Sequence, residues 1–110
     1  MKESKKSKVY LSGPITGFPE TQYKSAFNNA ELWLTSLGYD VVNPISYDPI
    51  PGELWEDYMK RDLKLLLDCD YIFMLEGFSA SKGAMIEFNL AVSLGIKPIE
   101  IDEDGNVIAL

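Results

Sequence analysis

The residue of this sequence that first suggests chemistry is Glu87, a carboxylate predicted to face the protein interior. In the helical pattern around it, at about 100° per residue, Lys82, Asn89 and Ser93 share one polar stripe. Glu87 falls on the other side, which is the packed side, with Gly83, Ala84, Ala91 and Leu94. A carboxylate buried there must be partnered, protonated or chemically active, because burying a bare charge costs free energy. The alternative interpretation is a glutamate of the first turns that favours the helix dipole and points to solvent.

The remaining residue types restrict what chemistry is available. Histidine is absent from the 110 residues, and Cys69 is the only cysteine. These counts exclude a histidine-based triad, a histidine-ligated metal, an intrachain disulfide and a cysteine-cluster metal site. Acid–base chemistry near neutral pH must therefore use carboxylates, tyrosine, lysine or water. We expect no metal and no cofactor, and we expect Cys69 to be a small buried thiol.

The composition is that of one folded domain with an acidic surface. A chain of 110 residues with 46% hydrophobic residues can form a core without disulfides or metals. The formal net charge of −7 argues against non-specific nucleic-acid binding, which needs a basic surface. No apolar run approaches the roughly 20 residues of a membrane span, and the N-terminus has no apolar signal region. We expect a cytoplasmic protein with no membrane partner.

Strands and helices alternate after a basic leader at residues 1–7, which we expect to be disordered. Such alternation implies right-handed βαβ units. The prediction for residues 8–110 is a single α/β domain, a Rossmann-like or flavodoxin-like three-layer sandwich. Its parallel sheet of four to five strands would carry helices on both faces. The expected strands are 8–12, 39–43, 71–75, 97–101 and 106–109, and the expected helices are 20–37, 53–68 and 82–95.

The topology also predicts where a ligand would bind. In open parallel sheets ligands bind at the carboxyl ends of the strands, which here are followed by loops 13–19, 43–52 and 76–83. Gly13 and Gly17 in the first loop would let a ligand approach the backbone closely, although a simple turn would explain both glycines.

The third loop opens the helix that contains Glu87. Ser81 and Gly83 would supply a hydroxyl, free N–H groups and the positive end of the helix dipole, which together suit a phosphate or a carboxylate. An N-cap serine without a ligand is the alternative. Glu87 follows Ser81 by six residues, about 9 Å along a helix. A 5′-phosphorylated sugar has about that reach.

Three further polar residues each have two interpretations. Tyr10 lies in the apolar run 8–12, where it is either a core tyrosine or a tyrosine whose hydroxyl orients a carboxylate. Asp62 and Asp70 are either structural caps or surface carboxylates. Asp70 precedes strand 71–75 instead of following it, so the pattern alone gives it no active-site role.

Taken together, these segments resemble the nucleoside 2-deoxyribosyltransferase superfamily. That group includes 2′-deoxynucleoside 5′-monophosphate N-glycosidases and small phage and bacterial relatives. The similarity is nearly ungapped from Tyr58 to Gly95, whereas residues 21–56 add similarity only at the level of the fold. The motifs are Val-Tyr-Leu-Ser-Gly-Pro-Ile at 9–15, Asp62-Leu63 with Leu66 and Cys69-Asp70, and Ser81 and Gly83 with Glu87, Ala91 and Gly95.

The resemblance implies roles for the residues already singled out. Glu87 matches the catalytic nucleophile, and Tyr10 matches the tyrosine that orients it. Asp70 matches an aspartate of the active-site set. Ser81 and Gly83 match the phosphate-binding residues of the monophosphate-specific branch.

Three other positions take their meaning from the resemblance. Asp62 matches a recurring aspartate, counted here with the substrate-binding residues. Gly13 and Ile15 match the loop that lies over the sugar or base. Thr16 stands where the monophosphate glycosidases carry an arginine, and Lys82 is the cation that the sequence places nearby.

The function implied by the resemblance is cleavage or transfer at the N-glycosidic bond of a 2′-deoxynucleoside or its 5′-monophosphate. A carboxylate below C1′ would stabilise an oxocarbenium-like transition state or form a covalent deoxyribosyl-enzyme. A neighbouring carboxylic acid, or water, would protonate the departing base. The alternatives are a non-catalytic nucleotide or nucleotide-sugar binding module with a vestigial site, and a small structural protein.

The resemblance also implies a homo-oligomer, a dimer or larger, with sites near the subunit interfaces. Family members complete their sites with residues of a neighbouring subunit. The apolar residues Trp55, Tyr58 and Met59 are candidates for that interface, although they would serve equally well in the core.

Overall fold

The structure is a computed structural model that describes residues 7–47 and 51–110. Most of the predicted leader, residues 1–6, and a short part of the loop predicted at 43–52 lie outside the described residues. Over the rest of the chain the predicted alternation of strands and helices is confirmed. The strands are β1 (Lys8–Ser12), β2 (Asp40–Val42), β3 (Tyr71–Met74), β4 (Lys97–Ile101) and β5 (Val107–Ala109), and the helices are α1 (Glu20–Ser36), α2 (Trp55–Leu66) and α3 (Lys82–Ser93), with short 3₁₀ helices η1 (Pro44–Ser46) and η2 (Phe78–Ala80).

Helix α2 is shorter than predicted at both ends, and local hydrogen bonding explains where it begins. The Asp57 carboxylate accepts a hydrogen bond from the backbone N–H of Leu54 at 3.0 Å, which caps the first turn from within the helix. The preceding backbone at Leu54 is extended. The helix therefore starts at Trp55.

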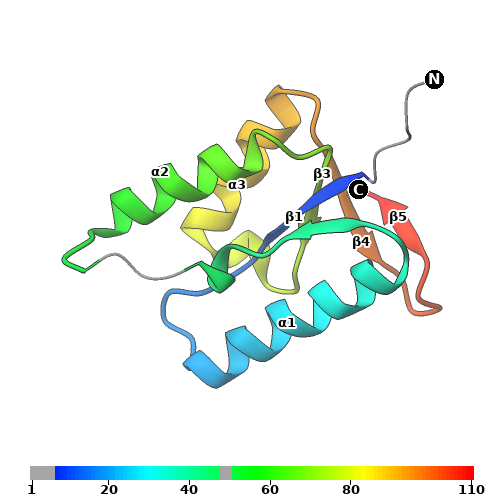
Figure 1. Cartoon of the computed structure of the whole chain (residues 1–110), viewed down its shortest axis with the longest axis horizontal. Coiled ribbons are helices and arrows are strands. Elements are labelled where there is room, and N and C mark those ends of the chain that lie inside the picture. The colour runs from blue at the N-terminus through cyan, green and yellow to red at the C-terminus, as the bar shows by residue number, and fades with distance from the viewer. Residues whose placement is uncertain (1–6, 48–50) are drawn as a thin grey trace.

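The sheet has the strand order β2-β1-β3-β4-β5 (Figure 1). The first four strands are parallel, as predicted, and β5 pairs antiparallel with β4. A parallel return would need a long crossover, whereas β4 and β5 are joined by a tight turn. In that turn the Asp102 carboxylate accepts hydrogen bonds from the backbone N–H groups of Asp104 and Asn106 at 2.9 and 2.8 Å.

Helices cover both faces of the sheet, with α1 on one side and α2 and α3 on the other (Figure 1). Side chains alternate between the two faces along a strand. Val9 and Leu11 accordingly pack in the cluster that includes residues of α1, whereas Tyr10 packs in the cluster that includes Leu66 and Ala91. The three-layer architecture is thereby confirmed, and the even-numbered residues of β1 face the α2–α3 layer.

The orientation of α3 follows the predicted wheel over most of its length. Lys82, Asn89 and Ser93 are exposed, and Glu87 is buried. The exception is Leu94, expected on the packed side, which is 55% exposed because the regular helix ends before it. Cys69 is buried, as expected. Within the described part of the chain, no helix has both the length and the apolar character needed to cross a membrane.

Candidate active site

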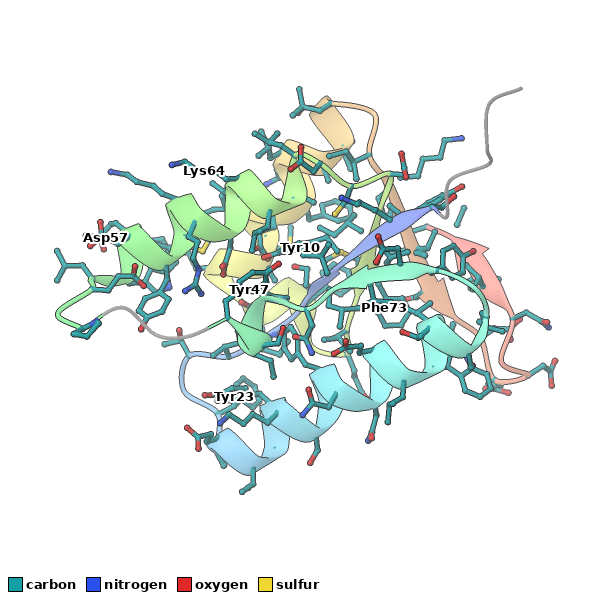
Figure 2. The ribbon with its side chains drawn as sticks, in the orientation of Figure 1. Tyr10, Tyr23, Tyr47, Asp57, Lys64 and Phe73 are labelled. Carbon is teal, nitrogen blue, oxygen red and sulfur yellow. The ribbon has the colours of Figure 1, made fainter. Side chains whose placement is uncertain are left out.

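A cavity of about 910 Å³ opens at the carboxyl edge of the parallel strands. Its walls come from the loop after β1, from η1 and the residue that follows it, from the starts of α1 and α3, and from one face of α2. The predicted location of the site is therefore where the structure has its cavity. Figure 2 shows two of the lining residues, Tyr23 on α1 and Tyr47 after η1, together with Tyr10 on β1, which is buried behind the cavity wall.

Glu87 lies in the wall of this cavity and is only 5% exposed. Its carboxylate accepts a hydrogen bond from the Tyr10 hydroxyl at 2.5 Å on Oε2 and one from the Ser12 hydroxyl at 2.7 Å on Oε1. Of the two interpretations of Glu87, the structure has the interior-facing one. Of the two interpretations of Tyr10, it has both at once, because the ring is in the core and the hydroxyl holds a carboxylate.

The surroundings of Glu87 favour its neutral form more than water does. The pKa of Glu87 is raised to about 7. Burial is the main cause, the charge of Asp62 adds to it, and the hydrogen bonds from Tyr10 and Ser12 act in the opposite direction. Burial and the Glu87 charge raise the pKa of Tyr10 well above its ordinary value. Near neutral pH Glu87 thus changes between its two forms while Tyr10 stays a proton donor.

Asp62, on α2, is a second carboxyl group in the same cavity. Its side chain is 13% exposed, and Nε and Nη2 of Arg61 each lie 3.4 Å from its Oδ1. The pKa of Asp62 is raised to about 6. Burial is the main cause, the charge and hydrogen bond of Arg61 act against it, and the charge of Glu53 adds to it. Two carboxyl groups that titrate near neutrality in one cavity can act as an acid–base pair.

The loop after β1 contributes Gly13, Ile15 and Thr16 to the cavity, as predicted. Gly13 is needed there for packing, since a Cβ on it would lie 2.7 Å from Cβ of Leu75. The loop can therefore lie directly against the chain that leaves β3.

Ser81 and Gly83 also line the cavity, at the start of α3. The Ser81 hydroxyl accepts a hydrogen bond from the backbone N–H of Ala84 at 3.2 Å, so Ser81 is an N-cap as well as a cavity residue. A Cβ on Gly83 would lie 3.2 Å from Sδ of Met59. The glycine lets the start of α3 approach α2 closely.

Asp70 requires a correction to the expected site. It is exposed and lies just before β3, at the amino edge of the sheet, and its carboxylate accepts a hydrogen bond from the backbone N–H of Lys8 at 2.9 Å. The described residues that line the cavity do not include it. The pattern of the sequence, in which Asp70 precedes the strand, indicated that Asp70 lies away from the cavity. Its match to the active-site aspartate did not.

Several residues in or next to the cavity were not anticipated. Ser12 does not line the cavity but bonds Glu87, which does. It was absent from the predicted set, although its spacing of two from Tyr10 on a strand was a usable signal. Trp55, Tyr58 and Met59, considered for an interface or the core, line the cavity. Arg61 and Lys24 join the expected Lys82 as cations in its wall.

Among the described residues, no group of three or more histidine, cysteine, aspartate or glutamate side chains is arranged to hold an ion. The chemistry that the cavity can supply is that of carboxyl groups, hydroxyl groups, cationic side chains and an aromatic wall.

A family model described as a domain of unknown function (DUF4406) matches residues 7–100, which contain every predicted site residue. The chain belongs to this family. The comparison of this DUF4406 domain with curated proteins finds no match. A solved structure of a 2-deoxyribosyltransferase from the psychrotolerant bacterium Bacillus psychrosaccharolyticus is similar to it, with a TM-score of 0.67 and 25% identity, covering 93% of this chain and 77% of that one.

The similarity confirms the resemblance drawn from the sequence motifs. The DUF4406 domain has a nucleoside 2-deoxyribosyltransferase-like fold with a five-stranded sheet. At the level of the family, this supports a role in nucleoside glycosyl transfer.

Proposed function

We propose that this DUF4406 domain cleaves or transfers the N-glycosidic bond of a 2′-deoxynucleoside or its 5′-monophosphate, with Glu87 as the nucleophile. The observation that carries the proposal is the buried Glu87 carboxylate, held by two hydroxyl groups in the wall of a cavity that also contains Asp62. A catalytic carboxylate needs a fixed orientation, partial exclusion from water and access to its substrate. Glu87 meets these three requirements.

The reaction would use the two carboxyl groups in different forms. Ionised Glu87 lies below C1′, where it stabilises the positive charge that develops as the C1′–N bond breaks, or forms an ester bond to C1′. The bonding electron pair leaves with the base, and protonated Asp62 donates its proton to that base. In the free protein the pKa of Glu87, about 7, lies above that of Asp62, about 6, so this arrangement requires the proton to move from Glu87 to Asp62 when the substrate binds. Water or a second free base then attacks C1′, breaks the ester bond and releases Glu87. In either case the Asp62 carboxylate accepts the proton that the attacking water, or the N–H of the attacking base, gives up.

The walls of the cavity suit the other parts of such a substrate. Tyr58 offers aromatic surface for a planar base. At the start of α3, Nζ of Lys82 lies 4.8 Å from the centre of the Trp55 ring, close to the capped helix end that would hold a 5′-phosphate. The volume of about 910 Å³ falls within the range of about 300–1,000 Å³ for small-molecule sites. We also expect a homo-oligomer in which a second copy helps to close the cavity.

A non-catalytic nucleotide-binding module is the second candidate. The observation that favours it is the exposed Thr16 in the first loop, where the monophosphate glycosidases carry an arginine. In that case a nucleotide would bind without turnover, and Glu87→Gln would leave its affinity unchanged.

The test is product analysis by liquid chromatography. The full chain and its Glu87→Gln variant would be incubated with a panel of deoxynucleosides and deoxynucleoside monophosphates, with and without a second free base. We expect free base or an exchanged nucleoside, and a decrease of at least about 10³-fold in the variant, because the nucleophile is lost. Product formed equally by both proteins, or no product from a folded, nucleotide-binding protein, would refute the proposed reaction.

A further inference from the structure

The Ser12 hydroxyl contacts the Glu87 oxygen that Tyr10 leaves open. Ser12 donates to Oε1 at 2.7 Å, whereas Tyr10 donates to Oε2 at 2.5 Å. Both donors come from β1, two residues apart, so both point to the same face of the sheet. A single hydrogen bond would leave the carboxylate free to turn about its Cγ–Cδ bond, whereas two donors on separate oxygens fix its plane.

The position of the Ser12 hydroxyl is set by the sheet. Ser12 is the last residue of β1, is 1% exposed, and lies in register with Met74 of β3. Its carbonyl accepts a hydrogen bond from the backbone N–H of Leu75 at 2.8 Å. Gly13, which follows, packs directly against the Leu75 side chain. A serine side chain has one rotatable bond that places its oxygen, so little freedom remains at this position.

We propose that Ser12 is a positioning residue whose hydroxyl, together with that of Tyr10, fixes the plane of the Glu87 carboxylate toward the cavity. Its role in turnover rests on the proposed function, but its contact with Glu87 does not. Ser12 differs from Tyr10 because it contributes little apolar surface to the core. Its hydroxyl can therefore be removed with a smaller change in packing than the tyrosine ring would require.

The charged groups around Glu87 determine what removal of this hydroxyl should do. Glu87 faces Tyr10 from β1 and Asp62 from α2, and Arg61 and Lys82 line the same cavity. The Ser12 hydrogen bond lowers the pKa of Glu87 against the effect of burial. Without this hydrogen bond, the neutral form of Glu87 becomes more stable relative to the ionised form. The carboxyl group should then titrate at higher pH.

The deciding experiment is a titration of the Glu87 carboxyl carbon by NMR in the unmodified protein, Ser12→Ala and Ser12→Thr. We expect the Ser12→Ala midpoint to rise by about one pH unit, the size of one hydrogen bond to a charged group, and Ser12→Thr to restore it. Ser36→Ala is the matched control, because the Ser36 hydroxyl bonds the carbonyl of Trp33 on α1. An unchanged Ser12→Ala midpoint would overturn the inference. Should Ser12→Ala not fold, Ser12→Cys keeps the shape with a poor donor and is judged by the same shift.

Activity separates this inference from the proposed function. In an active protein, Ser12→Ala should lower kcat about tenfold, leave KM nearly unchanged and move the acidic limb of the pH profile upward. An active variant with an unmoved pH profile would refute the positioning role. If the unmodified protein turned over none of the panel, the proposed function would fail, and the NMR midpoint would still decide whether Ser12 holds the carboxylate.

Discussion

Strand β1 binds a carboxylate at each of its ends, and the two carboxylates differ in almost every other respect. At the amino end, the backbone N–H of Lys8 bonds the exposed carboxylate of Asp70. At the carboxyl end, two side-chain hydroxyls bond the buried carboxylate of Glu87. A hydrogen bond to this strand is thus not what makes a carboxylate a candidate for chemistry. Burial at the edge of a cavity, with donors on both oxygens, is what distinguishes Glu87.

Asp70 instead joins strands. Its backbone N–H donates to the carbonyl of Lys8 at 2.9 Å, and its own carbonyl accepts a hydrogen bond from the N–H of Lys97 at 3.2 Å. With the side-chain bond to Lys8, these contacts tie β3 to β1 and to β4 where the strands begin. The role that the structure supports for Asp70 is alignment of the sheet.

The largest expected effect tests whether an aspartate at the carboxyl edge of the sheet matters for activity and one at the amino edge does not. Asp62→Asn should lower kcat/KM by about 10²–10⁴-fold, because the variant cannot donate a proton to the departing base. Asp70→Asn, at the amino edge, should retain activity close to that of the unmodified protein. Steady-state kinetics on the best substrate of the panel measures both. Equal losses in the two variants would remove the distinction between the edges.

A second effect concerns stability, and its sign follows from the raised pKa of Glu87. The folded state binds this proton more tightly than the unfolded state, so the stabilisation is complete below pH 4.5 and is lost as the pH rises through about 7. A rise from 4.5 to about 7 corresponds to about 3 kcal/mol. We expect Glu87→Gln to remove this part of the decline, as measured by urea unfolding at pH 5 and pH 8. A decline of the same size in the variant would mean that Glu87 is not buried in the way described.

The smallest expected effect is at the other end of β1. Asp70→Ala removes one exposed hydrogen bond to Lys8 and should cost about 1 kcal/mol of unfolding free energy, with little change in activity. Urea unfolding measures the loss, and a matched kinetic assay checks the activity. An inactive Asp70→Ala protein of nearly unchanged stability would show that this edge also takes part in catalysis.

The sequence patterns predicted the fold and the side of helix α3 on which Glu87 lies, because both depend on residues close together in the chain. The alternation of strands and helices and the 3.6-residue period depend on neighbouring residues alone. The period of two along a strand could have placed Ser12 on the same face as Tyr10. Its bond to Glu87 joins residues far apart in the chain, so the period alone could not reveal that contact. Helical spacing likewise predicted an apolar face on α2, but not that Trp55 and Tyr58 would line a cavity instead of being covered by another element. That outcome depends on where η1 and the loops pass.

The aromatic face of α2 leaves the core of this protein incomplete on one side. Apolar surface that would ordinarily be covered by another element is available to a ligand instead. A molecule that fits the cavity would therefore extend the core, and its binding would be linked to folding. At a concentration of 100 times its dissociation constant, such a molecule stabilises the folded state by about 2.7 kcal/mol. Thermal unfolding in the presence of a chemical library can thus identify the natural ligand of this domain before any reaction is known.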